Sequence, residues 1–273
     1  MMFRYVLGLL LTLASSFQVR AQVPATAVQS DSIQRVAPIL AAKPTGATPL
    51  VRRTIAPVVL RVGIPLTLIG VSYWGREQKL IRMARLEIRE EALQTFPTFR
   101  TRLDDYTRRV PMVAAYALHL AGVKPARGAV PFSLIYLAAH QLNAGVTSNL
   151  KRICREPRPD NPTDFSSFPS SHTSEAFMAA TLLHEQFGKT NPWISVGGYA
   201  VATATGAMRI LHNKHWITDV VAGAGIGFLS AEAVWRAYPY AARLLPAKVA
   251  EKLLLMPTYA PGGAAGMVMA VKL

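Results

Sequence analysis

The chain alternates long apolar segments with short charged ones. Five segments carry few charges: about Ile55–Trp74, Val110–Val123, Gly128–Leu150, Pro192–Met208 and His215–Ala237. They are longer than typical buried strands, so we predict a helix for each of them. The third segment contains no Asp, Glu, Lys or Arg and approaches the length of a bilayer span.

Polar patterns predict two further helices. Between Gly75 and about Phe96, apolar residues recur at helical spacing among Arg and Glu. The stretch from Ala176 to Phe187 follows a polar opening in which Thr173 and Ser174 can cap a helix. Strand-like alternation is weak and occurs only in the tail, over residues 266–273. The sequence therefore predicts an all-α fold, built as a multi-helix bundle.

The N-terminus has the features of a secretion signal. A basic start precedes an apolar run from Tyr5 to Phe17 and a small residue, Ala21, after which cleavage fits. An uncleaved signal anchor is the alternative. We expect four parts: a signal peptide (1–21), a flexible leader rich in Ala, Pro, Ser and Thr (22–53), a helical domain (54–240) and a C-terminal tail (241–273).

Composition favours a membrane protein over an ordinary soluble domain. Hydrophobic residues make up 51% of the 273 residues and charged residues only 16%, below the quarter that is usual in soluble domains. Together with the glycines at 223, 225 and 227, which permit close helix contacts, this favours a membrane-embedded bundle, with a soluble bundle as the alternative.

The charge balance indicates an anionic partner. Lys and Arg number 30 against 15 Asp and Glu, a net charge of +15. Such an excess suits nucleic acid, an anionic membrane face or an anionic substrate. The chain has no basic stretch interleaved with aromatics and no nucleic-acid module that we recognise, so we expect no nucleic-acid partner.

Candidate chemistry is concentrated in three short clusters. The first is Lys151 with Arg158-Pro159, the second is Pro169-Ser170-Ser171-His172, and the third is Arg209 with His215 and Asp219. Each alone has an ordinary explanation: a solvated basic helix end, a serine-rich cap, or a structural His–Asp contact beside a snorkelling arginine. Together they supply what phosphoryl transfer needs.

The residue types explain that chemistry. Lysine and arginine bind phosphate oxygens, and backbone N–H groups at a helix N-terminus stabilise an oxyanion. We expect His215 and Asp219 on one face of one helix, so that the acid orients the imidazole for attack on phosphorus. His172 has no metal-ligand partner at i+4, so the sequence indicates no metal, and we expect no cofactor.

The order and spacing of these clusters resemble the type 2 phosphatidic acid phosphatase superfamily, which also contains bacterial acid phosphatases and vanadium haloperoxidases. Its first motif, Lys-x6-Arg-Pro, is similar to Lys151 through Pro159, and its second, Pro-Ser-Gly-His, to residues 169–172. Its third, Ser-Arg-x5-His-x3-Asp, is similar to the run from Arg209 to Asp219. Ser171 stands where the family has glycine, and Met208 where it has serine.

The resemblance implies a helical bundle of the phosphatase/haloperoxidase type and a metal-independent phosphoric monoester hydrolase. His215 would attack phosphorus to form a phosphohistidine, Asp219 would orient it, and His172 would protonate the leaving group. Phosphate binding would fall to Lys151, Arg158, Ser170, Ser171 and Arg209.

The expected substrate is a lipid phosphate or pyrophosphate. With the signal, this implies an exported protein, either in a bacterial inner membrane with its site facing the periplasm or in the periplasm itself. Two alternatives remain: a vanadium-dependent haloperoxidase, and a non-enzymatic basic membrane protein that binds anionic lipid.

Overall fold

The computed structural model describes residues 56–242, 253–259 and 265–271. The predicted signal peptide (1–21) and leader (22–53) lie outside these residues. The helices are α2 (Ala56–Gly75), α3 (Lys79–Thr95), α4 (Leu103–Thr107), α5 (Val110–Leu120), α6 (Ala129–Cys154), α7 (Ser171–Phe187), α8 (Pro192–Leu211) and α9 (Ile217–Ala242). The strands are β1 (Leu253–Tyr259) and β2 (Ala265–Val271).

The apolar segments of the sequence form α2, α5, α6, α8 and α9, and the two polar patterns form α3 and α7. The predicted helical body is thus confirmed. Short α4 was not predicted, because its five residues are too few to show a period. The weak alternation in the tail corresponds to β2, which pairs antiparallel with β1, so that Leu253 faces Val271.

Two predicted helix starts were wrong by a few residues. Helix α7 begins at Ser171, and its cap is Ser170, whose side chain accepts from the Thr173 N–H, rather than Thr173 or Ser174. Helix α9 begins at Ile217, so His215 lies in the preceding turn and does not share a helix face with Asp219. In both cases a polar side chain satisfies a free N–H group at the helix end, which fixes where the helix starts.

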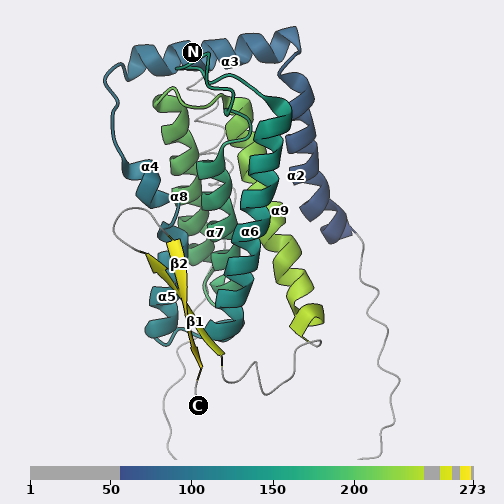
Figure 1. Cartoon of the computed structure of the whole chain (residues 1–273), viewed down its shortest axis with the longest axis vertical. Helices are drawn as coiled ribbons and strands as arrows, with labels where there is room; N and C mark the ends of the chain where they lie inside the picture. Colours follow the sequence, from purple (N-terminus) through teal and green to yellow (C-terminus); the bar gives the residue numbers. More distant parts are fainter. Residues whose placement is uncertain (1–55, 243–252, 260–264, 272–273) are drawn as a thin grey trace, which may run out of the picture. The chain divides into compact units, whose positions relative to one another are not determined.

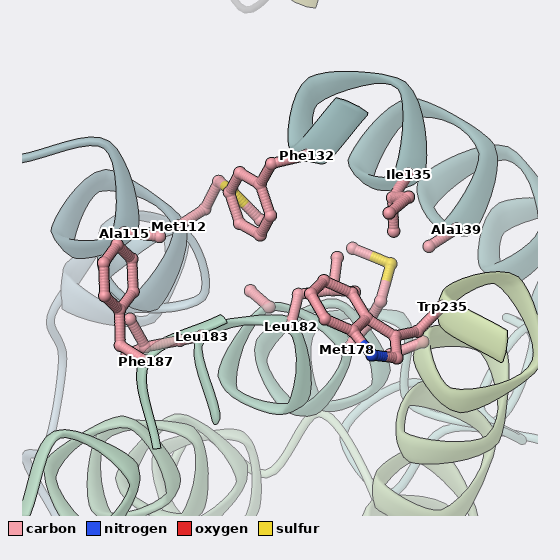
Figure 2. Packing of buried hydrophobic residues seen from close by; sticks show 12 residues of the cluster. Met112, Ala115, Phe132, Ile135, Ala139, Met178, Leu182, Leu183, Phe187 and Trp235 are labelled. Carbon is pink, nitrogen blue, oxygen red and sulfur yellow. The ribbon is translucent and has the colours of Figure 1, made fainter. Parts of the chain in front are cut away.

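The main hydrophobic core lies in the half of the bundle where α6 begins and α7 ends. Figure 2 shows side chains from four helices that meet there, including Phe132 and Ile135 of α6, Leu182 and Phe187 of α7, and Trp235 of α9. The opposite half, toward the start of α7, is packed with buried polar residues instead: Ser170, Thr173, Ser174 and Asp219. Buried polar groups need fixed partners, so this half is the natural place to look for a site.

Glycines let α7 and α9 approach each other very closely. A Cβ on Gly223 would lie 2.6 Å from the Ser170 carbonyl oxygen, and one on Gly227 would lie 2.0 Å from that of Ser174. These distances are too short for any side chain. The contact therefore fixes the first turn of α7 against the first turns of α9.

Helix α3 runs across the end of the bundle at which α7 and α9 begin (Figure 1). Two of its arginines hold the loops at that end. Arg85 donates to Glu156 at 2.5 Å, and its guanidinium lies 4.6 Å from the centre of the Trp216 ring. Arg89 donates to the Asn213 side chain at 2.8 Å and to the Pro159 carbonyl at 3.2 Å.

In length and composition, α9 alone among the described helices is suited to crossing a membrane, and 56% of its most apolar window is buried within the protein. The apolar part of α2, Val59–Gly75, is shorter. Yet α2 presents large apolar side chains outward, with Leu60 59%, Ile64 55% and Trp74 70% exposed.

The close approach of α7 and α9 gives a direct prediction. Gly227→Ala should destabilise the protein by about 1–3 kcal/mol or more, because the backbone carbonyl of Ser174 has to move. Gly197→Ala on α8 is the matched control, because nothing lies within 4 Å of its added Cβ and alanine favours a helix. Thermal unfolding of the purified variants measures both changes, and equal stability of the two would contradict the packing argument.

Candidate active site

All three sequence clusters lie at the end of the bundle beneath α3 (Figure 1). Helices α6 and α8 end there, which places Lys151 and Arg209 in their last turns. Helices α7 and α9 begin there, with His172 and Asp219 in their first turns. Groups that are far apart in the sequence are thereby gathered at one end.

Asp219 connects three chain segments. Its buried carboxylate accepts from the Ser167 hydroxyl at 2.6 Å and from the Trp216 N–H at 2.9 Å. The same oxygen lies 3.5 Å from His215 Nδ1. Its backbone carbonyl accepts from the Ser170 N–H at 3.0 Å, which joins α9 to the cap of α7. Although His215 precedes the helix, the turn still brings it to the acid.

His215 is held as a neutral base. Burial above all lowers the pKa of its imidazole to about 4; the charges of Lys151 and Arg209 act in the same direction, and Asp219 opposes them. At neutral pH the ring is therefore uncharged. His215 Nδ1 makes no hydrogen bond, but its contact with the Asp219 carboxylate at 3.5 Å favours the tautomer with the proton on Nδ1, which leaves the lone pair on Nε2.

Lys151 and Arg158 are tied to the loop before α7. Lys151 Nζ donates to the Ser166 carbonyl and, at 3.4 Å, to that of Ser167. Arg158 donates to the Ser166 hydroxyl at 3.1 Å, and its Nε lies 3.1 Å from an Asp164 carboxylate oxygen. Burial, and then the charge of Arg158, lower the pKa of Lys151 to about 8, so the lysine stays mostly charged at neutral pH.

The charge of Arg209 acts on both histidines of the site. The Arg209 side chain is buried, its Nη1 contacts a carboxylate oxygen of Asp104, and its Nε makes no hydrogen bond. Its charge lowers the pKa of both His172 and His215, so both imidazoles are within electrostatic range of one guanidinium. Because a buried donor without a partner is costly, a phosphate oxygen is a suitable acceptor for Arg209 Nε.

The two serines of the second cluster differ in their surroundings. Ser170 is fully buried, and its hydroxyl lies 2.9 Å from that of Thr173, so it is engaged in the helix cap. Ser171, the first residue of α7, lines a cavity of about 220 Å³ together with Lys151. A larger cavity of about 760 Å³ opens beside Arg209, Asp104 and Asp105.

The sequence did not reveal several residues that support this site. Ser167 holds Asp219, Asp104 holds Arg209, and Asp105 lies 2.8 Å from His172. Ser167 lies in the polar run before the second cluster, so its position was a usable signal. No sequence signal pointed to the two acids of α4, Asp104 and Asp105. Their partners, Arg209 and His172, lie 105 and 67 positions further along the chain.

Asp104, Asp105 and His172 also offer three potential metal-ligand atoms within 4.8 Å of one another. However, Asp104 already pairs with Arg209, and Asp105 with His172. A guanidinium in contact with one of the three ligands opposes the binding of a cation. We therefore assign no metal to this group.

Sequence comparisons relate the three clusters to known proteins. The sequence model of the PAP2 superfamily matches residues 132–243, which include every residue of the three clusters. Over 146 residues, 53% of this chain, the sequence is 37% identical to a lipid A 1-phosphatase of Porphyromonas gingivalis. The aligned part is 33% of that relative, so the chain spans about a third of its length. Residues 132–243 are thus similar to the PAP2 superfamily in sequence, which agrees with the resemblance seen in the motifs.

Two solved structures are also similar to the chain. A transmembrane PAP2-type phosphatidylglycerolphosphate phosphatase from Bacillus subtilis matches with a TM-score of 0.46 and 18% identity, over 67% of this chain and 98% of that one. LpxE of Aquifex aeolicus matches with a TM-score of 0.38 and 22% identity, over 54% of this chain and 93% of that one.

The buried neutral histidine makes stability depend on pH. The pKa of His215 is about 4 in the folded protein and about 6.5 in an unfolded chain. The contribution of neutral His215 to the free energy of unfolding is therefore complete above about pH 6.5. It is lost as the pH falls from about 6.5 to about 4, and the free energy of unfolding then decreases by at most about 1.4 kcal/mol per pH unit.

His215→Gln should remove this contribution, leaving a shallower slope to which His172 still contributes in the same direction. Denaturant unfolding of the wild type and the variant at pH 7 and pH 5 measures the difference. If the variant loses as much stability as the wild type between these two pH values, His215 is not buried in its neutral form.

Proposed function

We propose that this protein is a metal-independent phosphatase that hydrolyses a phosphorylated lipid through a phosphohistidine on His215. The observation that carries the proposal is the buried, neutral His215 beside Asp219, within the electrostatic influence of Lys151 and Arg209. A neutral imidazole with a free Nε2 is a competent nucleophile, and the surrounding cations offset the charge of a phosphate.

The reaction has two steps. His215 Nε2 forms a bond to phosphorus while the ester P–O bond breaks, and His172 gives a proton to the leaving alkoxide. A water oxygen then attacks the phosphohistidine, His172 takes up a proton from that water, and the P–N bond breaks to release inorganic phosphate. Lys151, Arg158 and Arg209 stabilise the equatorial oxygens, together with N–H groups near Ser170 and Ser171 at the start of α7.

A lipid substrate is supported by the surface as well as by the relative. The outward face of α2 is apolar along its length, and α8 exposes Trp193 (74%) and Val196 (50%). Apolar surface of this extent on a helical bundle suits contact with lipid. The lipid A 1-phosphatase of P. gingivalis, by its name, acts on a phosphorylated lipid.

The proposed arrangement is a bundle embedded in a membrane, with the site at the polar interface. Loops and α3 surround the site, and the long helices α2 and α8 carry large exposed apolar side chains. The predicted signal at 1–21 supports export, which would direct the site toward the periplasm of a bacterial inner membrane. We propose the same four parts as in the sequence prediction, with the helical domain at 54–240.

Replacement of the nucleophile tests the proposal. His215→Ala should reduce phosphate release from a lipid phosphate in detergent by at least about 10⁴-fold, because no other group can form the covalent intermediate. His184→Ala is the matched control: His184 lies on α7 but bonds to Ser195 at 2.8 Å, away from the site, so this variant should retain activity. Persistent hydrolysis by pure, folded His215→Ala protein would refute the assignment.

A second test concerns the proposed independence of metal ions. Incubation with EDTA, followed by removal of the chelator, should leave the rate of phosphate release unchanged, since the proposed electrostatic stabilisation comes from three cations and helix N–H groups. A loss of activity that a divalent ion restores would contradict the proposal.

A further inference from the structure

Helix α4 carries two neighbouring carboxylates, and each contacts a different residue of the site. Asp104 pairs with Arg209, and Asp105 Oδ1 lies 2.8 Å from His172 Nε2. Neither acid belongs to the three sequence clusters, and both precede the family-matched segment, residues 132–243. A five-residue helix thus provides each of these two site residues with an acidic partner.

The position of α4 is fixed at both ends. Before it, the Leu103 N–H donates to the Thr101 hydroxyl at 3.1 Å, and the Thr101 N–H donates to His212 Nε2 at 3.3 Å. At its last residue, Thr107, the side-chain hydroxyl accepts from the Thr205 hydroxyl of α8 at 2.8 Å. Asp105 is therefore presented to His172 by an anchored element, although its own side chain is 52% exposed.

His172 is surrounded by opposing charges. Burial lowers the pKa of its imidazole to about 4, and Arg209 of α8 and Arg108 after α4 act in the same direction. Asp104 and Asp105 oppose this effect, the latter through its hydrogen bond. Of the other charged groups near α7, Glu175 pairs with Arg108 and Arg109. Asp219 raises the pKa of both Lys151 and His215, and the charge of Lys151 lowers the pKa of His215.

The contact between Asp105 and His172 also determines which ring nitrogen of His172 can transfer a proton. The Asp105 carboxylate can only accept a hydrogen bond. His172 Nε2 must therefore be the donor in this contact, so Nε2 carries a proton. The nitrogen that remains to give a proton to the substrate and take one from water is Nδ1.

We propose that Asp105 is a positioning residue for His172: it holds the ring by Nε2 and stabilises the imidazolium, so that the ring, once it has taken up a proton from water at Nδ1, delivers that proton to the leaving alkoxide. This inference rests on the proposed function. Asp105 thus parallels Asp219: each histidine of the site has its own carboxylate, one for the nucleophile and one for the acid.

The experiment compares Asp105→Asn with the wild type on two substrates. Asparagine keeps a hydrogen-bond acceptor but loses the charge, so the pKa of His172 should fall. Hydrolysis of an alkyl phosphate, whose leaving group needs the proton, should drop about tenfold or more at neutral pH, and its high-pH limb should shift to lower pH. Hydrolysis of 4-nitrophenyl phosphate, whose leaving group needs little help, should stay within about threefold. Asp105→Glu should recover part of the loss.

Asp160→Asn is the matched control, because Asp160 pairs with Lys214 and contacts neither histidine of the site. This variant should keep the wild-type ratio between the two substrates. Equal losses on both substrates with an unmoved high-pH limb would reduce Asp105 to a structural role and overturn the inference, as would wild-type behaviour of Asp105→Asn. A wild type that hydrolyses neither substrate would instead refute the phosphatase proposal itself.

A second measurement does not depend on the variant folding. In wild-type protein with ¹⁵N-labelled histidine, the resonances of His172, assigned as those absent from a His172→Gln sample, should show the tautomer with Nε2 protonated at neutral pH. The tautomer with Nδ1 protonated would overturn the inference.

Discussion

The contact between α7 and α9 is the constraint on which the site depends. At Gly223 and Gly227 the two helices are so close that the carbonyls of Ser170 and Ser174 lie where side chains would be. This contact places the first turn of α7 beside that of α9 and allows the Ser170 N–H to bond to the Asp219 carbonyl at 3.0 Å. Asp219, which contacts His215, and the first turn of α7, which carries His172, are thus held together by the packing of α7 against α9.

Much of this arrangement can be predicted from the sequence, because helices and motifs leave local signals. The apolar segments gave the long helices, and the spacing of Lys151, Arg158 and His172 gave the clusters without knowledge of the fold. The residues at which the helices start were predicted less accurately. His215 was expected on the same helix face as Asp219, but the Trp216 N–H is bonded to the Asp219 carboxylate, and the helix begins only at Ile217.

What could not be predicted is the support around the clusters. Asp104, Asp105 and the α3 arginines contact the site through pairs separated by 67 to 124 residues, and no periodicity or spacing encodes such contacts. Asp104 and Asp105 were visible as adjacent acids before an apolar stretch, a pattern that many helix starts share. Only the three-dimensional path of the chain, with α4 against α7 and α8, gives them a role.

The arginines of α3 have a consequence for how the protein can be divided. A fragment confined to residues 132–243 would contain all three clusters, yet it would lack Arg85 and Arg89, which hold the loops at Glu156 and Asn213. It would also lack Asp104, so Arg209 would lose its carboxylate partner. The segment that matches the family model therefore lacks side chains that support the site, and boundaries chosen for expression need to begin before α3.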